Sequence, residues 1–364
     1  MDHRLRRENL LERFADIQVD AILVTRLPNV RYLTGFTGSN AQLLVTEAQT
    51  VFFTDGRYTE QSRHEVEGVE RVICLEGFDE ALAAQCSRLG SSRAKVGSFR
   101  VGFEAHDVTV SRHERLSDAL GAVELVRLGA EVEGLRRAKD QDEIAMLRRA
   151  QEVTDQAFEG ILDRLAVGLA ETQIAVELEV LLRREGADGL SFDPIVAFGE
   201  NAAEPHHAPG RRVLEEGDVI KLDFGAACGG YHADMTRTVA FGEPAPELKK
   251  IHELVREAQQ AGIDAVRAGA MARDVDHSAR SVIEAAGYGD SFTHGLGHGV
   301  GLEIHEAPNL GRRFEELLPE GAVVTIEPGI YLPGLGGVRI EDMVEVTPDG
   351  CRVLGTSPRE LIEL

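Results

Sequence analysis

Short apolar runs alternate with amphipathic stretches over the first part of the chain. The runs at residues 21–25, 41–46 and 50–54 predict strands, and the polar turn between the last two predicts a hairpin. Further strands are expected at 71–75, around Val96, at 101–103 and at 123–126, and helices over 58–66 and 79–89. Residues 1–130 are therefore predicted to form an N-terminal α/β domain.

Helical periodicity begins after a boundary predicted near residues 129–137. Asp140 and Glu143 have the spacing of a capping box, and the apolar residues behind them recur at helical intervals, which predicts a long helix. Further helices are expected over 171–184, 246–267 and 272–286, and strands over 195–198, 219–224, 236–241, 323–326 and 338–346. This order predicts that residues 131–364 form an α+β domain with mostly antiparallel strands.

The composition narrows the classes of partner. Lys and Arg number 39 against 62 Asp and Glu, a net charge of -23, which argues against nucleic acids and anionic membranes as partners. The four cysteines are scattered without a CxxC pair, so neither a disulfide framework nor a sulfur metal site is indicated. No apolar run reaches membrane length, and the charged first residues do not resemble a secretory signal, so a cytoplasmic location is expected.

Residues 293–306, THGLGHGVGLEIHE, combine closely spaced glycines with His294, His298 and His305. Glycine occupies every second position from 295 to 301, and each glycine inside a helix costs about 1 kcal/mol. Glycine also lets the backbone approach its neighbours closely. A strand and turn around one cavity is therefore expected here.

Four acids interrupt apolar, strand-like runs. Asp223 lies within VIKLDFG, and Asp234 follows it after the turn-forming pair Gly229-Gly230, so a hairpin is expected to bring both aspartates to one site. Glu327 ends the run VVTIE, and Glu341 lies two residues after Arg339, on the same face of a predicted strand.

A buried carboxylate needs a compensating cation, and one arginine cannot compensate four of them. Two divalent cations, with a bridging hydroxide between them and Arg339 nearby, would compensate the negative charge of all four carboxylates. A single histidine, His298, among several carboxylates makes an oxygen-rich site, which favours Mn²⁺, with Co²⁺, Fe²⁺ or Zn²⁺ as alternatives. The alternative that the residues leave open is a set of separate salt bridges.

The motifs LDFGA, ADMTRT, HGLGHGVGLEIHE, TIEPGIY and GVRIED resemble those of the pita-bread metallopeptidases. This group includes methionine aminopeptidase, Xaa-Pro aminopeptidase (aminopeptidase P) and Xaa-Pro dipeptidase (prolidase). The stretches NVRYLTGFTGS and FFTDGRYTEQ are similar to the creatinase/prolidase N-terminal domain, which methionine aminopeptidase lacks. The resemblance implies a pita-bread catalytic domain at 131–364 and a creatinase/prolidase-like domain at 1–130. It disfavours creatinase itself, which has the fold without the metal ligands.

The resemblance also implies a dinuclear metal site. Asp223 would chelate one cation, Asp234 and Glu341 would bridge both, and His298 and Glu327 would complete the second.

Three histidines outside the ligand set match positions that line the substrate site in the family. They are His294, His305 and the histidine of EPHHAPG, most simply His206. The family more often has an aliphatic residue and a single histidine where this chain has Glu204 and the pair His206-His207, so His207 stays open as the alternative.

The mechanism implied is hydrolysis of an Xaa-Pro bond by the metal-bridged hydroxide. His206 and His305 would donate hydrogen bonds to the developing oxyanion. Glu327 would carry the proton to the leaving nitrogen, and His294 with Arg339 would shape the proline side. The proline amide has no N–H, so most general peptidases fail at this bond.

The substrate length separates the two proline-directed alternatives. A dipeptidase has to bind the proline carboxylate, and the candidate arginines are Arg211, Arg212, Arg31 and Arg57. The last two stand beside tyrosines in segments that we predict to be turns. We expect a dipeptidase, with an Xaa-Pro aminopeptidase acting on longer peptides as the alternative and a metal-free binding module as the remote one. A homodimer is also expected.

Overall fold

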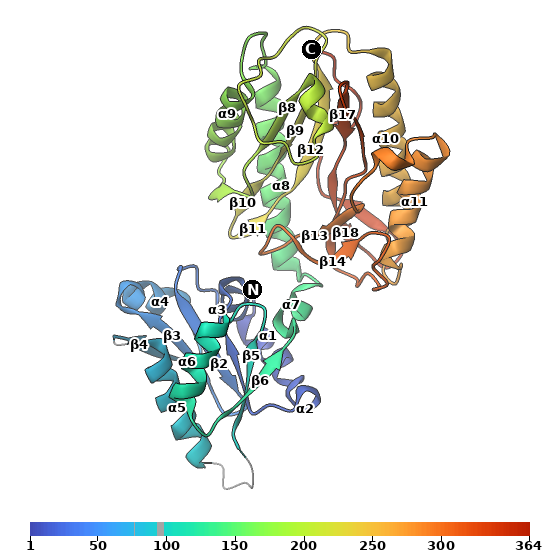
Figure 1. Ribbon diagram of the computed structural model, residues 1–364. Helices are drawn as coiled ribbons and strands as arrows, with labels where there is room; N and C mark the ends of the chain where they lie inside the picture. The colour runs from blue at the N-terminus through green and yellow to red at the C-terminus, as the bar shows by residue number, and fades with distance from the viewer. Residues whose placement is uncertain (76, 93–97) are drawn as a thin grey trace. The chain divides into compact units, whose positions relative to one another are not determined.

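The computed structural model describes residues 1–75, 77–92 and 98–364, so the strand expected around Val96 lies outside the described residues. The chain divides into two compact units, Met1–Arg136 and Arg137–Leu364 (Figure 1). Each unit is described below by itself.

The N-terminal unit is built on a mixed sheet in the order β4-β3-β2-β1-β5-β6. The antiparallel hairpin predicted from residues 41–54 is confirmed, and the flanking ladders β3-β4, β1-β5 and β5-β6 are parallel. The strands are β1 (Ala21–Val24), β2 (Ala41–Thr46), β3 (Thr50–Asp55), β4 (Glu70–Cys74), β5 (Arg100–Glu104) and β6 (Glu124–Leu128). The helices are α1 (His3–Leu11), α2 (Phe14–Ile17), α3 (Leu27–Thr34), α4 (Thr59–Glu65), α5 (Phe78–Ser92), α6 (Val110–Leu120) and α7 (Glu131–Arg136).

One predicted turn of this unit is wrong. Residues 29–32 lie inside helix α3, because Pro28 occupies its first turn, where proline is tolerated, and Gly35 ends it with a φ of 82°. The guanidinium of Arg6 stacks on the ring of Tyr32, 4.1 Å from its centroid. The other predicted turn, at Arg57, is the short 3₁₀ turn η1 (Gly56–Tyr58).

In the C-terminal unit the strands lie between two helical flanks (Figure 1). The first flank is formed by α8 (Gln141–Leu162) and α9 (Glu171–Arg184), and the second by α10 (Pro246–Ala265) and α11 (Ala272–Ala285). The predicted capping box at Asp140 and Glu143 starts α8. One hydrophobic core lies between the second flank and the strands, with Val255, Ile283 and Ile326 among its fully buried residues.

The ladders between the strands of this unit are antiparallel, as predicted. Their sheet orders are β12-β9-β8, β11-β10-β7, β14-β13-β15-β18-β19 and β16-β17. The first strands are β7 (Gly189–Leu190), β8 (Ile195–Phe198), β9 (Val219–Phe224), β10 (Ala226–Cys228), β11 (Tyr231–His232) and β12 (Met235–Ala240). The later ones are β13 (Gly297–Gly299), β14 (Glu306–Leu310), β15 (Val323–Ile326), β16 (Gly329–Leu332), β17 (Gly336–Arg339), β18 (Asp342–Val346) and β19 (Cys351–Val353).

The strand predicted over 338–346 is divided into β17 and β18. Ile340 and Glu341 lie outside both, and the Glu341 amide donates a hydrogen bond of 3.0 Å to the carbonyl oxygen of Thr236 in β12. The break therefore turns the chain from one sheet toward another at Glu341.

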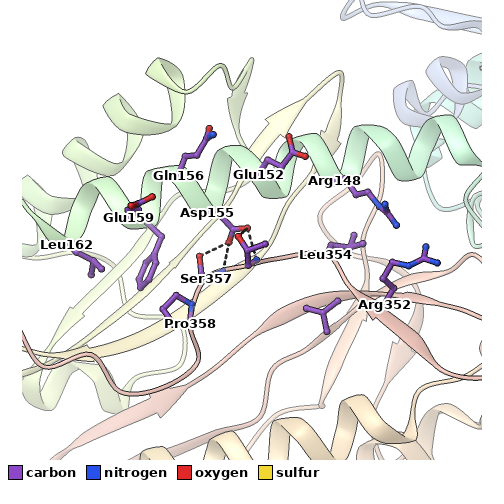
Figure 2. A pocket seen from close by; sticks show the side chains of 13 residues that line it. Arg148, Glu152, Asp155, Gln156, Glu159, Leu162, Arg352, Leu354, Ser357 and Pro358 are labelled. Atoms are coloured by element: carbon purple, nitrogen blue, oxygen red, sulfur yellow. Dashed lines mark hydrogen bonds between the residues drawn. The ribbon is translucent and has the colours of Figure 1, made fainter.

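Asp155 on α8 holds the C-terminal segment that follows β19 (Figure 2). Its carboxylate accepts hydrogen bonds from the amides of Thr356 and Ser357, at 2.9 and 3.3 Å, and from their hydroxyls, at 3.1 and 2.6 Å. From the other side, Arg237 donates to the carbonyl oxygens of Ser357 and Pro358 at 2.9 and 2.8 Å. The end of the chain is thus fixed to both α8 and β12.

Candidate metal centre

A cavity of about 700 Å³ opens in the C-terminal unit. Every residue that the sequence nominated for the metal site or the substrate histidines lines it, namely His206, His207, Asp223, Asp234, His294, His298, His305, Glu327, Arg339 and Glu341.

The two aspartates are brought together by a hairpin. Strands β9 and β12 pair so that Asp223 lies opposite Thr236, and Asp234 directly precedes β12. Gly229 and Gly230 close the connection as a two-residue turn with φ angles of 56° and 78°, a backbone conformation that glycine adopts without strain. The predicted hairpin is confirmed.

The glycines of the histidine segment give His298 a tightly packed strand. Strand β13 lies between β14 and β15. A Cβ atom on Gly297 would lie 2.0 Å from the Thr325 carbonyl oxygen, and one on Gly299 would lie 2.6 Å from the Glu306 carbonyl oxygen. The strand and turn expected for this segment are therefore confirmed, with glycine required by close backbone contacts.

Asp234, His298 and Glu341 form the centre of the site. Each offers a donor atom, and these atoms lie within 4.8 Å of one another. The Nε2 atom of His298 lies 3.5 Å from Asp234 Oδ2 and 3.7 Å from Glu327 Oε1. Four side chains from separate segments of the chain, in or next to strands, thus place their donor atoms around one small volume.

Asp223 stands at the edge of this group and is paired with the guanidinium of Arg339 through Oδ2. Its other oxygen, Oδ1, is buried and has no hydrogen-bond partner among the residues that the structure describes. A buried carboxylate oxygen without a partner is costly, and a cation would remove that cost.

The charges of the site are unbalanced. Burial, reinforced by the neighbouring carboxylates, raises the pKa of Asp234 to about 6, that of Glu327 to about 7, and that of Glu341 well above its usual range. Burial would lower the pKa of His298, but its hydrogen bond to Asp234 and the charges of Asp234 and Glu327 raise it to about 9. The carboxylates are therefore not compensated by enough positive charge. The donor atoms, carboxylate oxygens with one imidazole nitrogen, fit hard divalent cations.

Tyr331 was missed by the sequence analysis. Its hydroxyl accepts a hydrogen bond of 2.9 Å from Arg339 and lies 2.8 Å from Nε2 of His294, whose Nδ1 lies 2.8 Å from the Gly295 carbonyl oxygen. Since Nδ1 therefore carries the proton, Nε2 accepts from Tyr331. Burial and Arg339 lower the pKa of His294 to about 3, so the ring is neutral. Tyrosine is common in strands, so its place at the end of TIEPGIY gave no indication that it contacts His294 and Arg339.

Thr236 was missed as well. Its hydroxyl donates a hydrogen bond of 2.7 Å to Glu341 and accepts one of 3.0 Å from Nε of Arg339. This hydroxyl orients a predicted metal ligand in the way that outer residues orient ligands in metal sites. Its position directly opposite Asp223 in the hairpin is the one signal that could have found it.

The three remaining histidines differ in their surroundings. His206 is exposed and makes no hydrogen bond recorded within the described residues. The ring of His207 is held between two carboxylates, those of Glu204 and Glu171. The ring of His305 lies 4.3 Å from that of His298, centroid to centroid, and burial together with His298 lowers the pKa of His305.

Arg211 and Arg212, the candidate arginines of the C-terminal unit, are not among the described residues that line the cavity. Arg212 is paired with Asp218 at 2.8 Å. Arg57, in the N-terminal unit, is paired with Asp55 at 2.8 Å.

The comparisons with known proteins agree along the whole chain. Residues 145–348 match the model of metallopeptidase family M24, and residues 6–138 match the creatinase/prolidase N-terminal domain. Among the described residues, no helix has both the length and the apolar character that a membrane span needs.

Solved structures and sequences of relatives cover nearly all of the chain. An Xaa-Pro dipeptidase from Bacillus anthracis is 41% identical, with 100% of both chains covered and a TM-score of 0.95. An X-Pro aminopeptidase from Thermotoga maritima is 37% identical, with 99% of this chain and 100% of that one covered and a TM-score of 0.90. An Xaa-Pro dipeptidase from Pyrococcus horikoshii is 34% identical over 94% of this chain and 95% of its own length. The chain therefore belongs to metallopeptidase family M24 and has a creatinase/prolidase N-terminal domain.

Proposed function

We propose that this protein is an Xaa-Pro dipeptidase, which hydrolyses the peptide bond before proline with two divalent cations. The observation that carries the proposal is the cluster of three buried carboxylates, the partly buried Glu327 and His298 around one cavity. Among the described residues, Asp223 Oδ1 has no hydrogen-bond partner. The relatives named Xaa-Pro dipeptidase from Bacillus anthracis and Pyrococcus horikoshii support the choice of reaction.

The ligands we propose are Asp223, Asp234, His298, Glu327 and Glu341. Asp223 would hold one cation, Asp234 and Glu341 both, and His298 with Glu327 the other. Cations bound there would lower the pKa of a water molecule and polarise the scissile carbonyl group. We propose Mn²⁺ as the metal, because oxygen donors dominate the set.

The side chains around the ligands would act on the substrate directly. His206 and His305 line the cavity and would donate hydrogen bonds to the oxygen that gains charge in the transition state. Glu327 would receive the proton released by the attacking water and pass it to the proline nitrogen. We choose His206 over His207 because both ring nitrogens of His207 already face carboxylates.

His294 and Arg339 would shape the side that accepts proline. The neutral His294 ring is fixed through Tyr331 to Arg339, so a buried guanidinium maintains the orientation of a cavity-lining ring. A rigid wall of this kind suits a substrate residue whose own ring is rigid.

The second candidate is an Xaa-Pro aminopeptidase that acts on longer peptides, and the Thermotoga maritima structure named X-Pro aminopeptidase favours it. Cleavage of Ala-Pro and Ala-Pro-Ala by the manganese-loaded protein separates the two, with Ala-Ala as the control. We expect cleavage of Ala-Pro alone. Preference for Ala-Pro-Ala would establish the aminopeptidase, and cleavage of neither would reject both.

Metal analysis tests the remote alternative of a metal-free binding module. We expect two divalent ions per chain after dialysis against Mn²⁺, and none would support the binding module. The homodimer stays a prediction, which sedimentation velocity tests.

A further inference from the structure

The ring of His207 bridges two carboxylates. Its Nδ1 lies 2.6 Å from an oxygen of Glu204, and its Nε2 lies 2.9 Å from an oxygen of Glu171. A neutral imidazole has only one N–H, so it can donate to one carboxylate but not to both. The geometry therefore requires the doubly protonated, positively charged ring.

Glu171 is the fixed end of this bridge. Its side chain is fully buried at the start of α9 and accepts hydrogen bonds from the amides of Phe198 and Gly210, at 2.9 and 2.8 Å, and from the Asn201 side chain at 2.9 Å. Burial raises the pKa of Glu171, but these donors and His207 outweigh burial and lower it, so the group is a carboxylate. These hydrogen bonds hold the carboxylate in one orientation.

Glu204 is the exposed end, with 66% of its side chain accessible. The backbone next to it is held by two side chains from the strands, because Lys221 and Arg339 donate to the Pro205 carbonyl oxygen at 3.3 and 3.1 Å. Burial lowers the pKa of Lys221 to about 6, so of these two donors only Arg339 carries a permanent charge. His206 thus stands between a backbone held by Arg339 and a neighbour, His207, held by a charge that depends on pH.

We propose that His207 is a positioning residue whose imidazolium, bridging Glu171 and Glu204, holds the loop 204–210 so that His206 faces the metal-centre cavity. When the ring loses its proton, one of the two hydrogen bonds is lost and the loop is released. The effect on turnover rests on the proposed function, whereas the bridge itself does not.

Electrostatics supports the charged state. Burial lowers the pKa of His207, but the hydrogen bonds and charges of Glu204 and Glu171 raise it above its usual value of 6.5. Those two are the charged groups that act on the ring, one from the end of η2 (Gly199–Ala203) and one from α9. The charged bridge therefore stabilises the folded protein fully at pH values below 6.5, the ordinary pKa of histidine. This stabilisation is lost as the pH rises through the raised pKa of His207.

The first test measures the bridge without activity, by NMR of the histidine rings in the zinc-loaded protein, with His207→Gln to assign the signal. We expect the His207 ring to titrate above its ordinary pKa of 6.5 and to titrate at a lower pH in Glu204→Gln, which removes one of the two charges that raise its pKa. Glu200→Gln is the matched control, since Glu200 is equally exposed but contacts Arg212 instead. A ring that titrates at or below 6.5, or whose titration is unchanged in Glu204→Gln, overturns the proposal.

The second test asks whether His207 acts through His206, with Ala-Pro and the manganese-loaded protein. We expect kcat of the wild type to fall at alkaline pH. We expect His207→Gln to lower kcat on the order of tenfold at nearly constant KM and to remove that fall. Adding it to His206→Ala should cost nothing further, because coupled residues are not additive. Independent, multiplicative losses contradict the proposal, as does an unchanged pH profile.

Metal content and the wild-type rate separate this proposal from the proposed function. All the variants should keep two ions per chain, since none of them alters a proposed ligand. If the wild type fails to cleave Ala-Pro, the dipeptidase proposal falls and the NMR titration alone decides the His207 bridge.

Discussion

The hydroxyl of Thr236 donates a hydrogen bond of 2.7 Å to the carboxylate of Glu341. The same hydroxyl accepts from Arg339, so one buried threonine fixes both a proposed metal ligand and the cation behind it. Side chains that orient ligands in this way contribute strongly to metal affinity although they do not touch the metal.

We therefore expect Thr236→Val to weaken Mn²⁺ binding about 10- to 100-fold, because Glu341 loses the donor that orients it. Isothermal titration calorimetry measures the affinity. Thr154→Val is the control, because it removes another fully buried threonine hydroxyl, on α8. Equal affinities in Thr236→Val and wild type would contradict the role.

The isosteric substitutions Glu341→Gln and Asp223→Asn are expected to abolish turnover of Ala-Pro while the fold stays intact. In the metal-free protein the raised pKa of Glu341 already favours the neutral acid, so the amide should leave the metal-free Tm within about 2 °C. What the variant loses is the rise of Tm on adding Mn²⁺. Near wild-type activity in either variant would reject that ligand.

Metal binding is expected to release protons and to strengthen from pH 5 to pH 8. The pKa values of Asp234, about 6, and Glu327, about 7, lie above their usual ranges, so a cation competes with protons until the pH exceeds them. Because these pKa values are higher in the folded than in the unfolded state, the metal-free protein loses stability as the pH rises through them. The difference in Tm between the metal-loaded and the metal-free protein therefore widens. Calorimetry in two buffers of different ionisation enthalpy detects the released protons; equal heats would refute their release.

Tyr331→Phe is expected to free the His294 ring, because the hydroxyl that joins it to Arg339 is removed. Leaving these buried groups without their partner costs about 1–3 kcal/mol, so kcat/KM for Ala-Pro should fall on the order of tenfold or more. Metal content should not change, since Tyr331 contacts no proposed ligand through its hydroxyl in the hydrogen bonds described. A variant that loses its metals instead would assign Tyr331 to the metal centre.

Asp155→Ala is expected to destabilise the protein by about 2 kcal/mol, because the donors of Thr356 and Ser357 lose a charged acceptor. Asp155→Asn, which keeps one acceptor oxygen, should fall between the variant and wild type. Urea unfolding measures the difference, and Glu159→Ala on the same helix, exposed to solvent, is the control. Equal midpoints for Asp155→Ala and wild type would show that the segment is held by Arg237 alone.

The spacing of apolar residues along the chain predicted most strands and helices, because strands and helices each repeat with a different period. The hairpin of β9 and β12 was predictable because Gly229-Gly230 marks its turn, and the hairpin brings Asp223 and Asp234 together. The division between β17 and β18 was not, since the Glu341 amide bonds to a strand far away in the sequence.

The same limit applies within the site. Glu171 begins a helix, where acidic residues are common for reasons of capping and helix dipole. Nothing in the sequence around it indicates that its carboxylate meets His207, which comes 36 residues later. Contacts of this kind depend on how elements pack, and no periodicity carries them.

The close backbone contacts around Gly295, Gly297 and Gly299 also limit how the specificity of this protein can be redesigned. A Cβ atom at these positions would lie 2.6, 2.0 and 2.6 Å from carbonyl oxygens, so a mutant library that varies them returns misfolded clones. Substitutions that change specificity should therefore be made at side chains that line the cavity, such as Phe192 and Phe314.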